Sequence, residues 1–325
     1  MLNNKTILIT GGTGSFGKKA TETILKNYEP KKVIIFSRDE LKQYEMNQIF
    51  HVDKYPMRYF IGDVRDKERL HRAFHDVDYV IHAAALKQVP AAEYNPFEAV
   101  KTNVIGAQNV IDVAIDQRVK KVIALSTDKA ANPINLYGAT KLCSDKLFIA
   151  GNSYVGHDHS IFSVVRYGNV IGSRGSVIPY FIKQKEKGVF HITDPRMTRF
   201  WITLDQGVSF VMKCLEIMVG GELFVPKIPS MNIMDLAKAI CSGCRTEIIG
   251  IRPGEKLHEV MVPNEDARNT VEFENYYVIK NAFRFFEERF SGEICKPVPE
   301  DFEYNSGTNS QWLNVDDIRE IISQL

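Results

Sequence analysis

The feature that most constrains the fold is a regular alternation of short apolar runs with longer amphipathic ones in the first half of the chain. The short runs are rich in β-branched residues and apolar on both faces, as strands buried between two helix layers must be. This alternation indicates an α/β fold with a Rossmann-type, doubly wound parallel sheet. We expect strands at Thr6–Thr10, Lys32–Ser37, Met57–Ile61, Tyr79–Ala83, Lys121–Ser126 and Phe162–Arg166, and helices at Ser15–Asn27, Glu40–Phe50, Asp66–His75, Pro96–Arg118 and Tyr137–Asn152.

The rhythm changes after about Gly168, where turn-forming residues and mixed elements follow. We predict a Rossmann domain over residues 1–168 and a smaller, mixed C-terminal substrate domain over most of 169–325. A segment near 203–225, beginning with a helix near Thr203–Val219, is expected to return to the first domain. Ligands of such sheets bind at the carboxyl ends of the strands.

Charge argues against a nucleic-acid or membrane partner, because 41 Lys and Arg residues nearly balance 40 Asp and Glu residues in this 325-residue chain. The apolar stretch Gly207–Val225 is interrupted by Lys213, Glu216 and Glu222, which is not typical of a membrane span. The N-terminus lacks a signal-peptide pattern. We therefore expect a cytoplasmic protein.

The cysteines and histidines do not predict a metal site. Five cysteines are an odd number, and Cys241-Ser-Gly-Cys244 stands without a second C-x-x-C motif, so these two are interpreted as packing thiols near a helix end. His157 and His159 lack an evident third ligand and are interpreted as part of a solvated loop.

A glycine-rich turn follows the first predicted strand and opens the first predicted helix. Its sequence, T-G-G-T-G-S-F-G, matches the dinucleotide-binding pattern at Gly12, Gly14 and Gly17, and this context is the one the pattern requires. Glycines let the backbone approach a pyrophosphate at the helix N-terminus. The predicted contacts in this turn are Gly11, Thr13, Gly14, Ser15, Phe16 and Gly17.

The end of the second strand bears on the choice between NAD and NADP. Ser37 and Arg38 suit a ribose 2′-phosphate, whereas an NAD site usually offers a carboxylate there. Asp39 is a carboxylate, but it can equally cap the next helix. Asp63 can bind adenine or serve as a helix cap. We predict NADP, with further contacts from Lys42, Val64, Ala83, Ala85, Lys87, Asn103 and Val170.

Tyr137-Gly-Ala-Thr-Lys141 places a phenol and an amine on one face of a helix. A nearby ammonium, together with a nicotinamide ring, lowers the pKa of a tyrosine, which can then take a proton from an alcohol. The alternative is an exposed helix pair without a chemical role. The glycine-rich turn upstream favours the catalytic interpretation, in which both side chains also contact the cofactor.

Several segments make the chain similar to a known family. TGGTGSFG, His82-Ala-Ala-Ala85, Ser126-Thr127 and Tyr137-x-x-x-Lys141 resemble extended short-chain dehydrogenase/reductases acting on nucleotide sugars. A narrower resemblance, to the inverting UDP-N-acetylglucosamine 4,6-dehydratases, rests on SRDELKQ (Ser37–Gln43), HAAALKQVP (His82–Pro90), LSTDKAANPINLYGATK (Leu125–Lys141), RYGNVIGSRGSV (Arg166–Val177), MTRFWIT (Met197–Thr203) and GIRPGEKLHE (Gly250–Glu259). Those enzymes are lyases that begin pseudaminic acid synthesis for flagellin glycosylation.

The resemblance implies a mechanism for Thr127-Asp128-Lys129. In this family C4 is oxidised, C5 loses a proton, water leaves from C6, hydride returns to C6, and C5 is inverted. The product is UDP-2-acetamido-2,6-dideoxy-β-L-arabino-hexos-4-ulose. By resemblance Lys129 takes the C5 proton, Asp128 protonates the C6 hydroxyl, and Thr127 binds the C4 oxygen. Lys129 can act as a base only where part of its population is neutral; desolvation lowers its pKa and pairing with Asp128 raises it.

The resemblance also assigns substrate contacts. Lys87 is expected to face the active site, with a solvated loop lysine as the alternative. Asn169 and Arg252 are expected at the diphosphate and Glu255 at the uridine ribose. Thr193 and Arg199 are expected to line the uridine diphosphate pocket or to have a structural role.

Two other functions remain open at this point. A UDP-N-acetylhexosamine 4-epimerase would leave Asp128 and Lys129 without chemical duties, and a related capsule or O-antigen dehydratase would use similar chemistry. A non-catalytic NADP-binding sensor often lacks the Tyr or the Lys, and both are present here. The resemblance implies a homo-oligomer, with a hexamer as one form.

Overall fold

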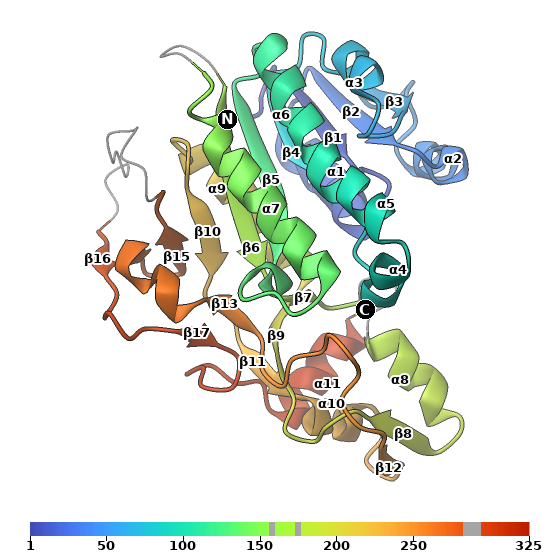
Figure 1. Cartoon of the computed structure of the whole chain (residues 1–325). Helices are drawn as coiled ribbons and strands as arrows, with labels where there is room; N and C mark the ends of the chain where they lie inside the picture. The colour runs from blue at the N-terminus through green and yellow to red at the C-terminus, as the bar shows by residue number, and fades with distance from the viewer. Residues whose placement is uncertain (156–159, 173–176, 282–293, 325) are drawn as a thin grey trace.

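A computed structural model describes residues 1–155, 160–172, 177–281 and 294–324. Its centre is a ten-stranded sheet with the order β16-β14-β15-β10-β6-β5-β4-β1-β2-β3 (Figure 1). The strands of its parallel part are β1 (Thr6–Thr10), β2 (Lys32–Ser37), β3 (Met57–Ile61), β4 (Tyr79–His82), β5 (Lys121–Thr127), β6 (Ile161–Tyr167) and β10 (Leu223–Pro226). The order β3-β2-β1-β4-β5-β6 confirms the predicted doubly wound fold.

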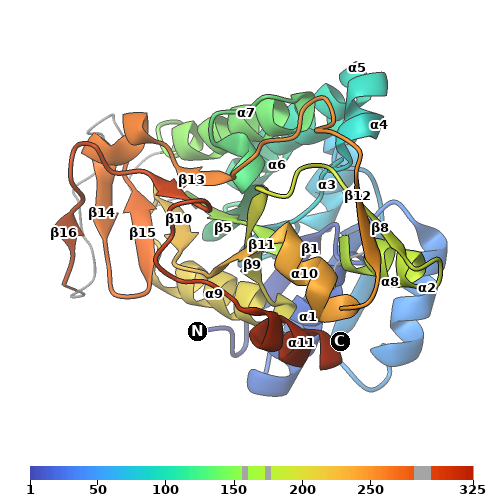
Figure 2. The same ribbon diagram turned by 90° about the horizontal axis from the view of Figure 1, so that it is seen from below.

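Two helix layers cover the parallel strands, which explains why these strands are apolar on both faces. α3 (Lys67–Ala73), α6 (Gly106–Asp116) and α7 (Leu136–Gly151) contact one another on one face, and α1 (Ser15–Asn27) contacts α9 (Leu204–Ile217) on the other (Figure 2). α2 (Glu40–Ile49) follows β2 and packs on β2 and β3. β1 is buried at all five positions.

The sheet continues beyond β10 with C-terminal strands that the sequence did not predict. β15 (Tyr276–Ile279) pairs antiparallel with β10, followed by β14 (Thr270–Glu272) and β16 (Lys296–Pro297). The 3-10 helix η3 (Asn264–Asn269) precedes β14. Aromatic side chains of this region, such as Tyr276 and Phe273 with stacked rings, join the main core.

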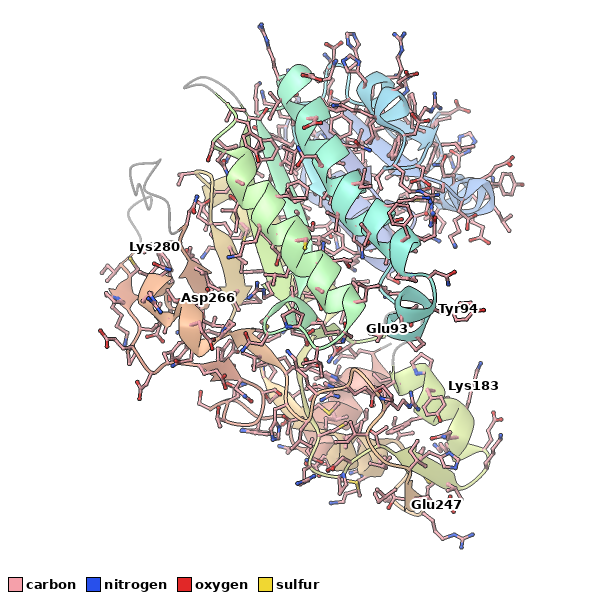
Figure 3. The ribbon with its side chains drawn as sticks, viewed as in Figure 1. Glu93, Tyr94, Lys183, Glu247, Asp266 and Lys280 are labelled. Carbon is pink, nitrogen blue, oxygen red and sulfur yellow. A yellow bond between two sulfur atoms is a disulfide. The ribbon has the colours of Figure 1, made fainter. Side chains whose placement is uncertain are left out.

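A second hydrophobic core lies below the carboxyl ends of the parallel strands (Figure 1). Residues of α8 (Val177–Lys185), β8 (Val189–Ile192), α10 (Ile233–Ile240) and α11 (Val315–Ser323) contribute to this core, and the exposed strand β12 (Arg245–Ile248) pairs with β8. We call this unit the lower lobe. The strands β7 (Asn169–Val170), β9 (Thr198–Ile202) and β11 (Ser230–Asn232) form a small sheet between it and the main sheet, and β13 (Val260–Val262) pairs with β17 (Tyr304–Asn305). In Figure 3, Lys183 on α8 and Glu247 on β12 lie in the lower lobe.

The helix expected over residues 96–118 is interrupted. After α4 (Val89–Tyr94), the chain forms α5 (Pro96–Val100), a π-helical turn η1 (Lys101–Ile105) and then α6. π-helical turns inside helices are frequent at functional sites. The extra residue of a π turn rotates the helix that follows by about 100° relative to the helix before it, so α5 and α6 do not share one continuous apolar face.

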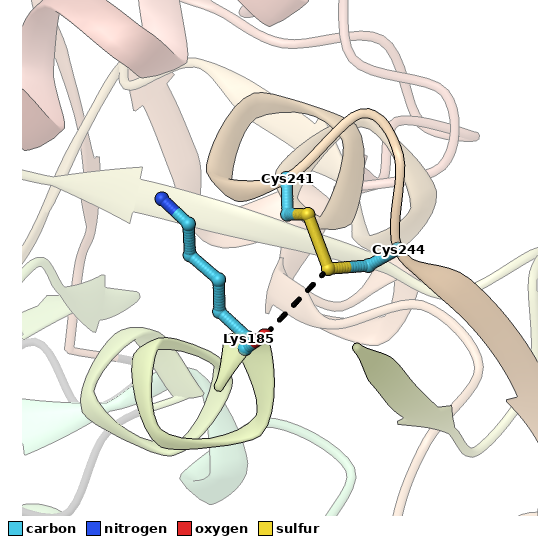
Figure 4. Close-up of a disulfide and its surroundings, with 3 residues drawn as sticks. All are labelled: Lys185, Cys241 and Cys244. Atoms are coloured by element: carbon cyan, nitrogen blue, oxygen red, sulfur yellow. Dashed lines mark hydrogen bonds between the residues drawn. A yellow bond between two sulfur atoms is a disulfide. The ribbon is translucent and has the colours of Figure 1, made fainter. Parts of the chain in front are cut away.

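The interpretation of Cys241 and Cys244 as unpaired packing thiols was wrong, because the structure joins them in a disulfide (Figure 4). α10 ends at Ile240, and the turn that follows brings the two Cα atoms to 5.5 Å, within the usual range for a disulfide. Cys244 Sγ also lies 4.0 Å from the carbonyl oxygen of Lys185. This contact is not a hydrogen bond, since a disulfide sulfur carries no proton. Cysteine counting missed the pair because the closure is local to one turn.

Within the described residues, no helix is both long enough and apolar enough to span a membrane. The same residues contain no group of three or more His, Cys, Asp or Glu side chains that could hold a metal ion. His157 and His159 lie outside the described residues.

Candidate active site

A cavity of about 1270 Å³ lies at the carboxyl ends of the parallel strands, and lower-lobe residues close its other side. Its walls combine the glycine-rich turn, the ends of β2, β4 and β5, the start of α7 and the segment Arg252–Glu255. The predicted cofactor residues that line it are Gly11, Thr13, Gly14, Ser15, Phe16, Gly17, Ser37, Arg38, Asp39, Lys42, Asp63, Val64, Ala83, Ala85, Lys87, Tyr137, Lys141 and Val170.

The glycine-rich turn needs its glycines for close backbone approach. A Cβ on Gly17 would lie 2.3 Å from the carbonyl oxygen of Gly12, so α1 could not start so near β1. Gly11 adopts φ = +64°, and a Cβ there would lie 2.9 Å from the backbone of Ala84. Gly14 is the N-cap of α1 and has no side chain, which leaves the helix N-terminus open to the cavity. This arrangement suits a dinucleotide pyrophosphate.

After the end of β2, Arg38 is a cation that can bind a phosphate, whereas the carboxylate of Asp39 is already paired with Lys42. Asp39 caps α2, because its side chain accepts a hydrogen bond from the backbone N–H of Lys42. Asp39 also forms an ion pair with Lys42 Nζ at 2.6 Å. These bonds with Lys42 lower the pKa of Asp39. Arg38 is half exposed, and its Nη1 lies 3.5 Å from Asp63. The side chain of Asp63 mainly accepts hydrogen bonds from Arg65.

Asn103 does not line the cavity, although it was predicted as a cofactor contact. It is buried in the π-helical turn, where its side-chain amide bonds both backbone groups of Leu86 and the hydroxyl of Thr140. Asn103 therefore fastens the loop after β4 to α7. Sequence reasoning could not place it because the π turn decides which way this residue faces.

Thr127, Asp128 and Lys129 lie together where β5 ends and a single 3-10 turn, η2 (Asp128–Ala130), begins. Asp128 Oδ1 accepts hydrogen bonds from Thr127 Oγ1 at 2.9 Å and from Lys129 Nζ at 3.0 Å. Thr127 and Lys129 line the cavity, whereas Asp128 is 1% exposed and lies behind them.

Tyr137 and Lys141 are presented by α7, whose first turn is capped by Asn135 and approached by Glu93 of α4 (Figure 3). Burial raises the pKa of Tyr137 to about 12, although the Lys129 ammonium and a hydrogen bond with Thr127 act to lower it. Burial also lowers the pKa of Lys141, against the opposing carboxylate of Asp145.

Glu259 is a site residue that the sequence did not single out. Its carboxylate is buried, and its Oε1 lies 3.4 Å from Lys129 Nζ and 3.7 Å from Arg199 Nε. Burial acts to lower the pKa of Lys129, but the carboxylates of Asp128 and Glu259 outweigh it and raise that pKa above its ordinary value. Lys129 is therefore an ammonium in this state of the protein. The only sequence signal for Glu259 was its place in the segment Gly250–Glu259.

All six predicted substrate residues line the cavity: Lys87, Asn169, Thr193, Arg199, Arg252 and Glu255. Arg199 is the most constrained, because its Nη1 donates to the carbonyls of Thr198 and Leu257. Arg252 is largely exposed and lies 3.9 Å from Glu255. Thr193 Oγ1 contacts the sulfur of Met197 at 3.0 Å.

The segment that contains Arg252 and Glu255 is fastened to the catalytic elements. Asn135 donates a hydrogen bond to the carbonyl of Gly254, and Lys256 Nζ donates one to the carbonyl of Ala131. Substrate-side and catalytic residues thus share one framework.

The doubly wound sheet, the open helix N-terminus and the Tyr137/Lys141 helix define a nucleotide-binding α/β scaffold of the short-chain dehydrogenase/reductase type. More narrowly, the chain belongs to the family described as polysaccharide biosynthesis proteins, whose model matches residues 7–281.

Relatives with known names confirm the resemblance drawn from the motifs. A Campylobacter jejuni protein named UDP-N-acetylglucosamine 4,6-dehydratase (inverting) is 57% identical over 99% of this chain and 98% of its own length. A Rickettsia bellii protein named UDP-glucose 4-epimerase is 42% identical over 100% of this chain and 97% of its own. The solved structure of Pen from Bacillus thuringiensis has a TM-score of 0.90 at 36% identity, covering 100% of this chain and 98% of that one.

Proposed function

We propose that this protein is an NADP-dependent, inverting UDP-N-acetylglucosamine 4,6-dehydratase. The observation that carries the proposal is the side chain of Lys129, which lines the cavity with Tyr137 and is paired with Asp128 behind it. Dehydration needs proton carriers beyond those of alcohol oxidation, and this pair supplies two. The 57% identity to the C. jejuni dehydratase supports the same function.

The cavity fits a dinucleotide at the glycine-rich turn, where Gly14 leaves the N-terminus of α1 open to the cavity. Arg38, which follows β2, is the cation that suits a 2′-phosphate, and the carboxylate of Asp39 is already paired with Lys42 of α2. When bound, the cofactor would accept the hydride lost from C4 and would return it to C6 after water has left. Ser37 and Arg38 therefore favour NADP over NAD.

The proposed steps assign one task to each side chain. Tyr137, beside Thr127, takes the proton of the C4 hydroxyl as C4 is oxidised, and the new ketone acidifies the C5 proton. The amine of Lys129 takes that proton. Asp128 supplies the proton that leaves with the C6 hydroxyl as water. Return of a proton to the opposite face of C5 inverts that carbon.

The wider setting is part of the proposal. Residues 1–168 are proposed to bind the cofactor and most of 169–325 the UDP-sugar, with Arg252 and Asn169 at the diphosphate, Glu255 at the ribose, and Lys87, Thr193 and Arg199 along the same pocket. We propose a cytoplasmic homo-oligomer, such as a hexamer, whose product enters pseudaminic acid synthesis for flagellin glycosylation.

The test is to incubate the purified protein with UDP-N-acetylglucosamine and follow the reaction by NMR in heavy water. We expect a product with a C6 methyl group, a C4 ketone and deuterium at C5. An unchanged substrate, or a product that keeps its C6 hydroxyl, contradicts the proposal.

A UDP-N-acetylhexosamine 4-epimerase is the second candidate, favoured by the 42% identity to the Rickettsia epimerase. The variant Lys129→Ala separates the two functions, because an epimerase needs no base at C5. For a dehydratase we expect turnover to fall roughly 100- to 10,000-fold, the usual contribution of a general base. The exposed residue Lys54 provides the matched control, Lys54→Ala. Product formation that survives Lys129→Ala in a folded protein favours the epimerase.

A further inference from the structure

Glu259 joins the end of β5 to the substrate side of the cavity. It stands just before β13 and ends the stretch that starts with Arg252, while Lys129 belongs to η2. β13 packs against η2, which brings the two side chains together across 130 positions of sequence. Among the described residues, Glu259 Oε2 has no hydrogen-bond partner, so the ion pairs made by Oε1 are the main compensation for burying this charge.

The ammonium of Lys129 is shared by two carboxylates. Its Nζ lies 3.0 Å from Asp128 Oδ1 and 3.4 Å from Glu259 Oε1. The other charged or titratable groups that face it are Arg199 of β9, which opposes its charge, Tyr137 of α7 and Lys256. The result is a row of alternating charges from Asp128 through Lys129 and Glu259 to Arg199.

The proposed function requires a different distribution of the same protons. Lys129 must be an amine and Asp128 an acid, so one proton has moved from the ammonium to the carboxylate. The carboxylate of Glu259, through its 3.4 Å contact with Nζ, favours the ammonium. Arg199 favours the amine. The balance between the two forms therefore depends on residues from outside the Thr-Asp-Lys motif.

We propose that Glu259 is a positioning residue whose carboxylate holds the amine of Lys129 at the end of β5 and sets the balance between the ion pair and the amine–acid pair. The role of the Lys129 amine in this inference rests on the proposed function. The contact between Glu259 and Lys129 does not depend on that function.

The backbone of Glu259 is held independently of its charge. The Glu259 N–H donates a hydrogen bond to Ser306 Oγ at 2.8 Å, and the Ser306 N–H donates one to the Glu259 carbonyl at 2.8 Å. Neither bond involves the Glu259 carboxylate. Ser306 Oγ in turn lies 2.7 Å from Thr198 Oγ1. The variant Glu259→Gln, which keeps the shape of the side chain, is therefore expected to fold.

The experiment compares Glu259→Gln with the wild type as pH is raised. Lys129 is followed by ¹⁵N NMR of its Nζ, assigned with Lys129→Arg, and by the alkaline limb of the dehydration rate at saturating UDP-N-acetylglucosamine. Removing the negative charge of Glu259 makes it easier for the Asp128–Lys129 pair to lose its last proton. We expect the midpoint in Glu259→Gln to fall by about one pH unit or more, the usual effect of one nearby charge.

Two further variants fix the sign. Glu259→Asp keeps the negative charge and should return the midpoint most of the way to its wild-type value. Arg199→Gln removes a cation and should move the midpoint to higher pH. The exposed Glu265 provides the control Glu265→Gln, which should leave the midpoint unchanged. A midpoint that stays at the wild-type value in a folded Glu259→Gln variant overturns the inference. If Glu259→Gln fails to fold, the direction of the shift in Arg199→Gln decides.

The two proposals fail in different ways. A wild type that does not dehydrate UDP-N-acetylglucosamine contradicts the proposed function, yet the NMR titration still measures the effect of Glu259 on Lys129. A wild type that dehydrates the substrate, with no shift in a folded Glu259→Gln variant, contradicts the inference alone.

Discussion

At the scale of single residues, the site depends on close approach as much as on chemical groups. Gly138 follows Tyr137 on α7, and a Cβ on it would lie 2.1 Å from the carbonyl oxygen of Lys129. The helix that presents the phenol therefore packs directly on the backbone that presents the amine. A glycine at this position is needed for the spacing of the two side chains, and not for an unusual φ angle.

Gly138→Ala is expected to push η2 away from α7. The overlap should lower the free energy of unfolding by about 1–3 kcal/mol, and a displacement near 1 Å should lower the dehydration rate about 100-fold. Urea unfolding and steady-state kinetics measure the two effects. The control is Gly243→Ala, because a Cβ on Gly243 meets open space. Equal effects of the two substitutions would show that the contact with Lys129 is unimportant.

Arg38 gives a second prediction at this scale. Its side chain is half exposed, its Nη1 lies 3.5 Å from Asp63, and it lines the cavity where a 2′-phosphate is expected. A charge-assisted hydrogen bond contributes about 1.5–3 kcal/mol, so Arg38→Ala should raise the Kd for NADP roughly 10- to 100-fold and leave that for NAD nearly unchanged. Calorimetric titration with both cofactors measures this, with exposed Arg58→Ala as the control. An equal loss for NAD would remove the argument for a phosphate at Arg38.

At the scale of elements, the disulfide closes the link between α10 and β12. β12 pairs with β8, and β8 leads into the Thr193 side of the cavity. The bridge spans only three positions, so it removes little freedom from the unfolded chain.

Replacing both Cys241 and Cys244 with Ser should therefore lower the free energy of unfolding by at most about 2 kcal/mol. Reductant should lower the wild-type urea midpoint to that of the double variant and leave the double variant unchanged. Cys143→Ser, at an exposed free thiol, is the control. A wild type insensitive to reductant would mean that the two thiols are not joined in solution.

At the scale of the whole molecule, the sequence predicted the parallel sheet because each strand is apolar on both faces and bounded by turn residues. It also predicted most of the cavity wall, since motifs at strand ends converge on one edge of such a sheet. It did not predict β14, β15 and β16, because these strands are only 3, 4 and 2 residues long, too short for an alternating pattern to stand out. It missed Glu259 and misplaced Asn103 for a different reason, since the direction of each side chain depends on tertiary contacts.

The packing of β13 against η2 has a consequence for protein engineering. Grafting Thr-Asp-Lys into the strand end of an epimerase would transfer the amine and its neighbouring acid but leave behind the carboxylate that comes from residue 259. Such a chimera would have its new base in a different electrostatic environment. A transplant that carries both segments, with the Ser306 backbone contacts that hold the second, is the smallest unit we expect to convert one activity into the other.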